Sequence, residues 1–126
     1  MTKTIIISST QASAGKSVLA IGSYLKMQEQ NINVGYFKPI GDAMEQAPIS
    51  RVDKDVSVIS AVVQRQYSKE EICPHFFTPE YILDELYLDE TEPIVQKTKD
   101  AFKKMQNKAE IIIVEGNHSI FQYSAL

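Results

Sequence analysis

The feature that most constrains this fold is a run of three isoleucines, Ile5 to Ile7, followed by a loop of small residues and a helix start. Consecutive β-branched residues predict a short strand over residues 3–8, buried on both faces of a parallel sheet. The loop at residues 9–15 leads into a helix predicted over residues 16–30, with an apolar face made of Val18, Ile21, Gly22 and Leu25. A strand, a small-residue loop and a helix in this order are typical of proteins that bind phosphate groups.

The later part of the chain continues the alternation of strands and helices. A second strand is predicted at residues 34–37 and ends at Lys38-Pro39, because proline cannot continue a ladder. Helices are predicted over residues 53–63 and 92–106, an extended and partly buried loop over 72–81, and a third strand over 111–114. This order predicts one α/β domain over residues 1–126, with a parallel sheet and crossover helices.

The composition excludes several classes of function. The chain has 126 residues and a net charge of −3, which argues against a general nucleic-acid binder. One cysteine and two histidines supply neither an internal disulfide nor a metal-ligand cluster. No apolar run approaches the ~18 residues of a membrane span, so we expect a soluble cytoplasmic protein without a membrane partner.

Polar groups follow the ends of all three predicted strands, at residues 9–17, 38–42 and 115–119. Because the carboxyl ends of parallel strands meet at one edge of a sheet, we expect these segments to converge and form a ligand site.

The first of these segments predicts a phosphate-binding loop. Backbone N–H groups and the helix N-terminus would attract negative charge, while Lys16 reaches the β/γ-phosphates and the Ser17 hydroxyl reaches Mg²⁺. Thr10 stands where the usual pattern has its first glycine, and the alternative is a plain helix start with a solvated lysine. The residues predicted to bind the nucleotide are Thr10, Gln11, Ala12, Ser13, Ala14, Gly15, Lys16, Ser17 and Val18.

Acidic residues in the other segments are candidates for holding Mg²⁺. Glu115 ends an Ile/Val strand, where its carboxylate would bind the ion directly or through water. Asp53 and Asp55 are candidates for a further contact or, alternatively, are N-terminal caps of the following helix. With Ser17 and Glu115 beside one hydrated ion, we expect their oxygens to lie within roughly 8 Å of each other.

Lys38 is the second catalytic candidate beside Lys16. At the mouth of the site it would hold a small anionic substrate or stabilise a transferring phosphoryl group, and the alternative is a surface lysine. We assign His118 to a loop rather than to a base, and Cys73 to a buried thiol. Aromatic residues of the middle segment are assigned to the core: Phe76, Phe77 and Tyr81.

Several motifs resemble those of the dethiobiotin synthetase family. The loop at residues 8–17, the second-strand stretch at 34–41, the acidic segment at 53–56, the proline–aromatic stretch at 73–77 and the glutamate motif at 114–116 are each similar to a family motif. Together they span residues 4–119. The resemblance implies a P-loop NTPase-type fold with ATP and Mg²⁺ as cofactors. It also implies that Lys16 and Lys38 lie near phosphates or substrate, and that the metal-binding residues are Ser17, Asp55 and Glu115.

Residues 115–119 resemble the Glu-Gly-x-x-Ser form found in dethiobiotin-synthetase-like N-terminal domains of phosphotransacetylases, rather than the glycine-rich form of true synthetases. Ala12 and Asp42 stand where true synthetases have hydroxyl groups near their substrate, which argues against dethiobiotin synthesis. The resemblance therefore implies a regulatory nucleotide-binding domain of a phosphotransacetylase-type protein. The alternatives are an ATP-dependent ligase that phosphorylates a carboxylate or carbamate, and a structural α/β module without ligand.

Two further expectations concern completeness and assembly. Family members continue with more strands and with residues that hold the adenine base, so we expect the domain to be truncated at its C-terminus. The two apolar strands offer more surface than about two helices can cover, and monomers seldom leave such patches bare. Because dethiobiotin synthetases are homodimers, the resemblance also implies a homo-oligomer.

Overall fold

The computed structural model describes residues 1–11, 13–42, 44–45, 51–62, 66–77 and 92–119. A three-stranded parallel sheet in the order β1-β7-β2 forms its centre. These strands are β1 (Lys3–Ser9), β2 (Val34–Phe37) and β7 (Ile111–Ser119). The parallel sheet with its crossover helices confirms the predicted α/β fold, although β7 continues well past the predicted end at residue 114.

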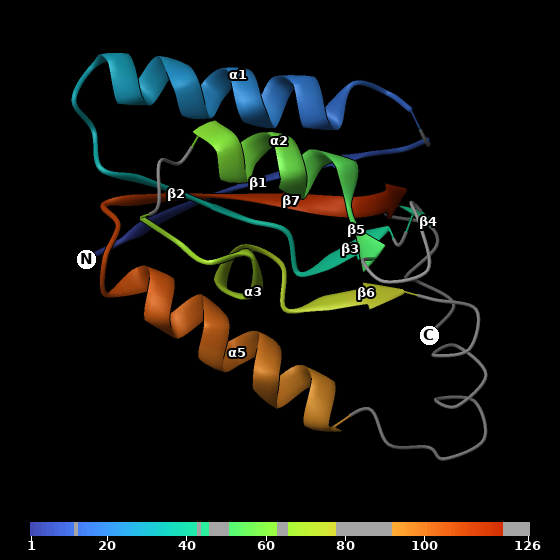
Figure 1. Ribbon diagram of the computed structural model, residues 1–126. Coiled ribbons are helices and arrows are strands. Elements are labelled where there is room, and N and C mark those ends of the chain that lie inside the picture. The colour runs from blue at the N-terminus through green and yellow to red at the C-terminus, as the bar shows by residue number, and fades with distance from the viewer. Residues whose placement is uncertain (12, 43, 46–50, 63–65, 78–91, 120–126) are drawn as a thin grey trace.

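Helices cover the two faces of this sheet. α1 (Lys16–Glu29) lies on one face and α5 (Glu92–Gln106) on the other (Figure 1). Both helices follow their predictions to within one residue. α1 begins directly after Gly15, whose φ of 88° places it in the left-handed region that favours glycine.

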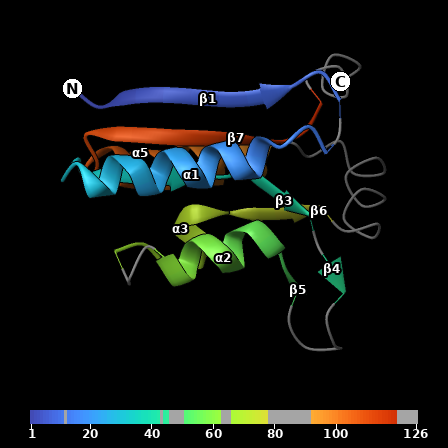
Figure 2. The same ribbon diagram turned by 90° about the horizontal axis from the view of Figure 1, so that it is seen from above.

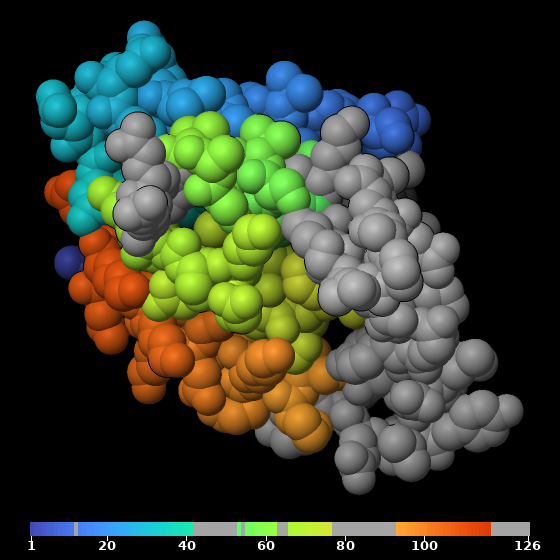
Figure 3. All heavy atoms as spheres, viewed as in Figure 1, coloured from blue at the N-terminus to red at the C-terminus, as the bar shows by residue number. Residues whose placement is uncertain are grey.

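Smaller elements lie beside the sheet. Two short strands, β3 (Ile40–Asp42) and β6 (His75–Phe77), pair in parallel. Two others, β4 (Met44–Glu45) and β5 (Arg51–Val52), pair antiparallel. The helices α2 (Lys54–Val62) and α3 (Lys69–Ile72) fill the space between α1 and α5 (Figure 3). The sequence predicted α2 but neither α3 nor β6, which begins within the predicted extended loop.

The core between the sheet and α5 depends on a close approach at Gly35. A Cβ atom at this position would lie 2.8 Å from the Met105 Sδ atom, so only glycine lets the helix pack at this distance. Next to it, the rings of Phe37 and Phe102 meet edge to face, with centroids 5.3 Å apart. These contacts fix β2 against α5, and β2 then delivers Lys38 to the carboxyl edge of the sheet.

The prediction that β1 is buried on both faces is wrong. β1 is an edge strand, and Figure 2 shows it beyond the part of the sheet that α1 and α5 cover. Ile6 is 72% exposed and Ile5 40%, whereas Ile113 on the neighbouring strand is fully buried. A β-branched run thus indicated a strand correctly but did not indicate its place in the sheet.

The predicted apolar face of α1 is also wrong in part. Val18 is 79% exposed and Leu25 is exposed as well, whereas Ala20 and Tyr24 are fully buried. The helix packs over β7 and β2 through Ala20 and Tyr24, so its apolar stripe through Val18 is turned away from the covered core.

Candidate functional site

A buried network of charged side chains lies beyond the carboxyl end of β2 and beside the middle of β7. Lys38 is 2% exposed, and its Nζ lies 2.9 Å from Asp53 Oδ2 and 3.0 Å from Asp55 Oδ2. Glu115 is 1% exposed in the same network. A charge in the interior is tolerable only when it is paired and hydrogen-bonded, and this network supplies those partners. The structure brings together residues from all three of the predicted segments.

The Ser17 hydroxyl joins the two sides of this network. Its Oγ lies 2.8 Å from Asp55 Oδ2 and 2.6 Å from Glu115 Oε1, well inside the expected 8 Å. A hydroxyl carries one hydrogen, so Ser17 donates to only one of these carboxylates at a time. The second short oxygen–oxygen contact therefore needs a proton or a cation to be favourable.

Lys38 lies beneath the site rather than at its mouth, and it is not a surface lysine. Burial alone lowers the pKa of an ammonium group, but the hydrogen bonds and charges of Asp53 and Asp55 outweigh it. Together they hold the pKa of Lys38 above its ordinary value, so this residue carries its positive charge throughout the neutral range.

The two aspartates have different roles in the network. Asp53 Oδ1 accepts from the backbone N–H groups of Asp55 and Val56, at 2.8 and 3.1 Å, which caps the start of α2. Its other oxygen holds Lys38. Asp55 instead points toward Ser17, the predicted metal ligand on α1. The sequence left both interpretations open for each residue.

The predicted phosphate loop stands next to this network. Lys16 is buried, and its Nζ donates to Ser9 Oγ at 3.1 Å across the loop. The loop residues between them are exposed, apart from Ala12, which lies outside the described residues. The first turn of α1 contributes no acidic side chain of its own, which favours an anion at the helix N-terminus.

Tyr36 is the site residue that the sequence analysis missed. Its side chain is 0% exposed, and its hydroxyl donates to Glu115 Oε2. Burial and the neighbouring Glu115 charge raise its pKa, so it stays a donor. A signal existed in the strand register: Tyr36 pairs with Ile113, two residues before Glu115, which puts all three on one face of the sheet.

The other candidate residues either lie away from the network or have side chains outside the part of the chain that the structure describes. Cys73 is buried as expected; burial raises its pKa to about 12, and its thiol donates to the His75 carbonyl at 3.1 Å. Phe76 packs against the core. Tyr81 and the side chains of Asp42, Phe77 and His118 lie outside the described residues, but the backbone of His118 belongs to β7, so its assignment to a loop is wrong.

The oxygen donors of the network fit a Mg²⁺ ion. Among the residues that the structure describes, no three His, Cys, Asp or Glu side chains form a metal-binding group. Mg²⁺ keeps several waters and needs few protein ligands, so one hydroxyl and two carboxylates suffice. The oxygens of Ser17, Asp55 and Glu115 converge, and the single hydroxyl proton of Ser17 can serve only one of its two short contacts. These three residues are therefore a suitable set of ligands for the ion.

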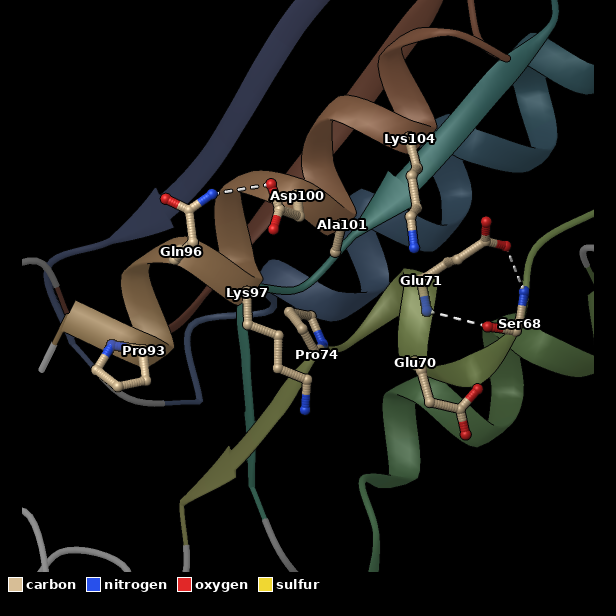
Figure 4. Close-up of a pocket in the computed structure, with 10 residues that line it drawn as sticks. All are labelled: Ser68, Glu70, Glu71, Pro74, Pro93, Gln96, Lys97, Asp100, Ala101 and Lys104. Carbon is tan, nitrogen blue, oxygen red and sulfur yellow. Dashed lines mark hydrogen bonds between the residues drawn. The ribbon is translucent and has the colours of Figure 1, made fainter.

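A separate hollow of about 510 Å³ lies between α3 and α5 (Figure 4). Lys97, Lys104 and Glu70 line it together with the capping box in which Ser68 and Glu71 bond each other's backbone. Its charges are mixed, and none of its lining residues belongs to the buried network.

Comparisons with known proteins agree with this architecture. A family model described as an AAA domain matches residues 3–125. The ATP-dependent dethiobiotin synthetase BioD of Nitrosopumilus maritimus (strain SCM1) is 27% identical over 118 residues, which are 90% of this chain and 50% of that protein. The chain thus spans about half the length of this curated relative. Among the described residues, every helix is too short or too polar to cross a membrane. The chain belongs to the AAA domain family, with a dethiobiotin-synthetase-like P-loop.

Proposed function

We propose that this protein binds Mg–ATP at the edge formed by the loop, β2 and β7. The observation that carries the proposal is the convergence of Ser17, Asp55 and Glu115 within hydrogen-bond distance, next to the phosphate loop. The relative named as an ATP-dependent synthetase supports the same ligand.

Each residue would have a distinct task in this site. Lys16 and the amides at the start of α1 would bind the phosphates, and Ser17, Asp55 and Glu115 would hold the ion. Bound Mg²⁺ would neutralise phosphate charge. Asp53 keeps Lys38 in place when Asp55 turns to the ion, because Lys38 bonds both aspartates. Lys38 would then stabilise a transferring phosphoryl group or a small anionic substrate.

The finer assignment in this proposal is a regulatory nucleotide-binding domain of a phosphotransacetylase-type protein. The Glu-Gly-x-x-Ser form of residues 115–119 supports it. The second candidate is an ATP-dependent ligase that phosphorylates a carboxylate or carbamate, which the similarity to a synthetase favours. Release of phosphate from ATP that depends on an added carboxylate or amine would select the ligase.

Self-association and a cytoplasmic location complete the proposal. Ile5 and Ile6, which project from opposite faces of the edge strand β1, and Val18 and Leu19 at the start of α1 are exposed apolar side chains that a second copy of the chain would cover. The single cysteine, Cys73, is a buried thiol, which suits a reducing compartment.

Replacement of the loop lysine tests nucleotide binding. Lys16→Ala should weaken binding of ATP or ADP about tenfold or more, equivalent to ~1.4 kcal/mol, because it removes a charge-assisted contact to phosphate. Calorimetric titration in the presence of Mg²⁺ measures the change. Lys26→Ala is the matched control, since Lys26 lies in the last turn of the same helix and pairs with Glu29 at the surface. Equal affinities of wild type and Lys16→Ala would contradict the proposal.

A further inference from the structure

The contact between Tyr36 and Glu115 is the part of the network that the proposed function leaves unexplained. The Tyr36 hydroxyl donates to Glu115 Oε2, while Glu115 Oε1 lies 2.6 Å from Ser17 Oγ. Each oxygen of this carboxylate therefore has its own partner. Oε1 faces the predicted ion beside Ser17, and Oε2 is held by the Tyr36 hydroxyl.

The backbone makes this arrangement rigid. Tyr36 lies on β2 and Glu115 on β7, and the two strands pair in parallel from Val34 to Phe37. The hydroxyl and the carboxylate thus project from two elements that the same ladder holds in register. Side chains on paired strands are positioned more accurately than side chains on loops.

Packing alone does not account for a tyrosine at this position. Phenylalanine would fill almost the same space, but it would leave Glu115 Oε2 without this donor at a residue that is 1% exposed. A buried oxygen that loses its donor bears the cost of its lost hydration. The phenolic hydroxyl is therefore the functional part of the side chain, and its target is Glu115.

We propose that Tyr36 is a positioning residue, which fixes the Glu115 carboxylate so that only Oε1 faces the ion beside Ser17. This inference rests on the proposed Mg–nucleotide site. Groups that hydrogen-bond a metal-binding side chain typically change metal affinity by about 10- to 100-fold when they are removed. Tyr36 touches neither nucleotide nor substrate in this scheme and acts only through Glu115.

The test is Tyr36→Phe, with ADP binding titrated at a series of Mg²⁺ concentrations and again in EDTA. The Mg²⁺ concentration that gives half of the full effect should rise about tenfold, while the affinity for ADP in EDTA stays unchanged. A residue with a merely structural role would alter both. Tyr24→Phe is the matched control, because Tyr24 is equally buried and its hydroxyl bonds Gln28, outside the network. Its Mg²⁺ dependence should equal that of the wild type.

A second variant separates positioning from other effects. In a Glu115→Gln background, adding Tyr36→Phe should cause little further change, because the group that Tyr36 positions is already altered. An equal further loss would overturn the proposal, and so would a folded Tyr36→Phe protein with unchanged Mg²⁺ dependence. A Tyr36→Phe protein without cooperative unfolding would overturn it too, since the hydroxyl would then support the fold itself. Wild-type ADP binding that is insensitive to Mg²⁺ would instead overturn the proposed metal site, and this role with it.

Discussion

Two regions of the molecule, the buried network and the β1 side of the central sheet, place polar and apolar side chains in opposite ways. Beyond the carboxyl end of β2 and beside the middle of β7 the protein buries Lys38, Asp53 and Glu115. Along β1 and the adjoining surface of α1 it exposes isoleucine, valine and leucine, with Ile6 72% and Val18 79% accessible. The hydrophobicity of these individual residues therefore does not predict their burial, either in the network or along β1.

Partners and coverage explain the difference. The charged side chains are buried because each finds an opposite charge or a donor within about 3 Å. Ile5 and Ile6 are exposed because β1 is an edge strand, whereas Ile7 of the same strand is buried. We therefore expect the buried network to be sensitive to single substitutions and the β1 side to be tolerant of them.

The largest effect is expected from Lys38→Met. This change removes the cation between Asp53 and Asp55 and leaves two buried or half-buried carboxylates facing each other. Breaking a buried ion pair from one side should lower the free energy of unfolding by about 3–5 kcal/mol. Urea unfolding followed by circular dichroism measures it.

The control for this change is a lysine in a surface pair. Lys26→Met breaks the exposed Lys26–Glu29 bridge, whose atoms lie 2.9 Å apart. Exposed pairs contribute about 0.2–1 kcal/mol, so this variant should unfold almost as the wild type does. Equal losses in the two variants would contradict the contrast between the two kinds of ion pair.

An intermediate effect is expected from alkaline pH through Cys73. Burial raises its pKa from 9.0 to about 12, so the unfolded chain releases this proton at lower pH than the folded chain does. The stabilisation is complete below pH 9 and is lost as pH rises toward 12. Between pH 9 and 10 the wild type should lose about 1 kcal/mol of stability through this group.

Cys73→Ala tests this assignment. The packing that is lost with the thiol costs the same at every pH, but the fall in stability between pH 9 and 10 should become shallower because the titrating group is gone. The pKa of Tyr24, which burial raises from 10.0 to about 12, adds its own fall above pH 10 in both proteins. Parallel curves for wild type and variant from pH 8 to 10 would show that Cys73 does not titrate as described.

The sequence predicted local features better than their surroundings. Residue types indicated the strand at Lys3–Ser9 and the helix at Glu92–Gln106, since β-branched runs and helical spacing act over a few residues. Glycine, lysine and strand-end patterns also indicated that Ser17 and Glu115 would lie close together, as they do.

What the sequence did not reveal depends on contacts between distant segments. The place of β1 at the edge depends on the order of strands, which no run of isoleucines encodes. The contact of Tyr36 with Glu115 joins residues 79 positions apart through the register of β2 and β7. The sequence placed Lys38 at the mouth of the site or on the surface, and its burial depends on the two aspartates that lie beside it.

The smallest effect on stability is expected from Ile6→Lys on β1. Ile6 is largely exposed, so the substitution removes little buried apolar area and should change the free energy of unfolding by about 0.5 kcal/mol or less. Its effect on assembly should be much larger, because a charge in the exposed apolar surface opposes its cover by a second copy. Light scattering should give about twice 14.2 kDa for the wild type and a lower mass for Ile6→Lys at equal concentration. A wild-type mass near 14.2 kDa over a wide concentration range would contradict self-association. If Ile6→Lys were instead as destabilising as Lys38→Met, Ile6 would not be exposed as described. The contrast between the buried network and the β1 side of the sheet would then fail.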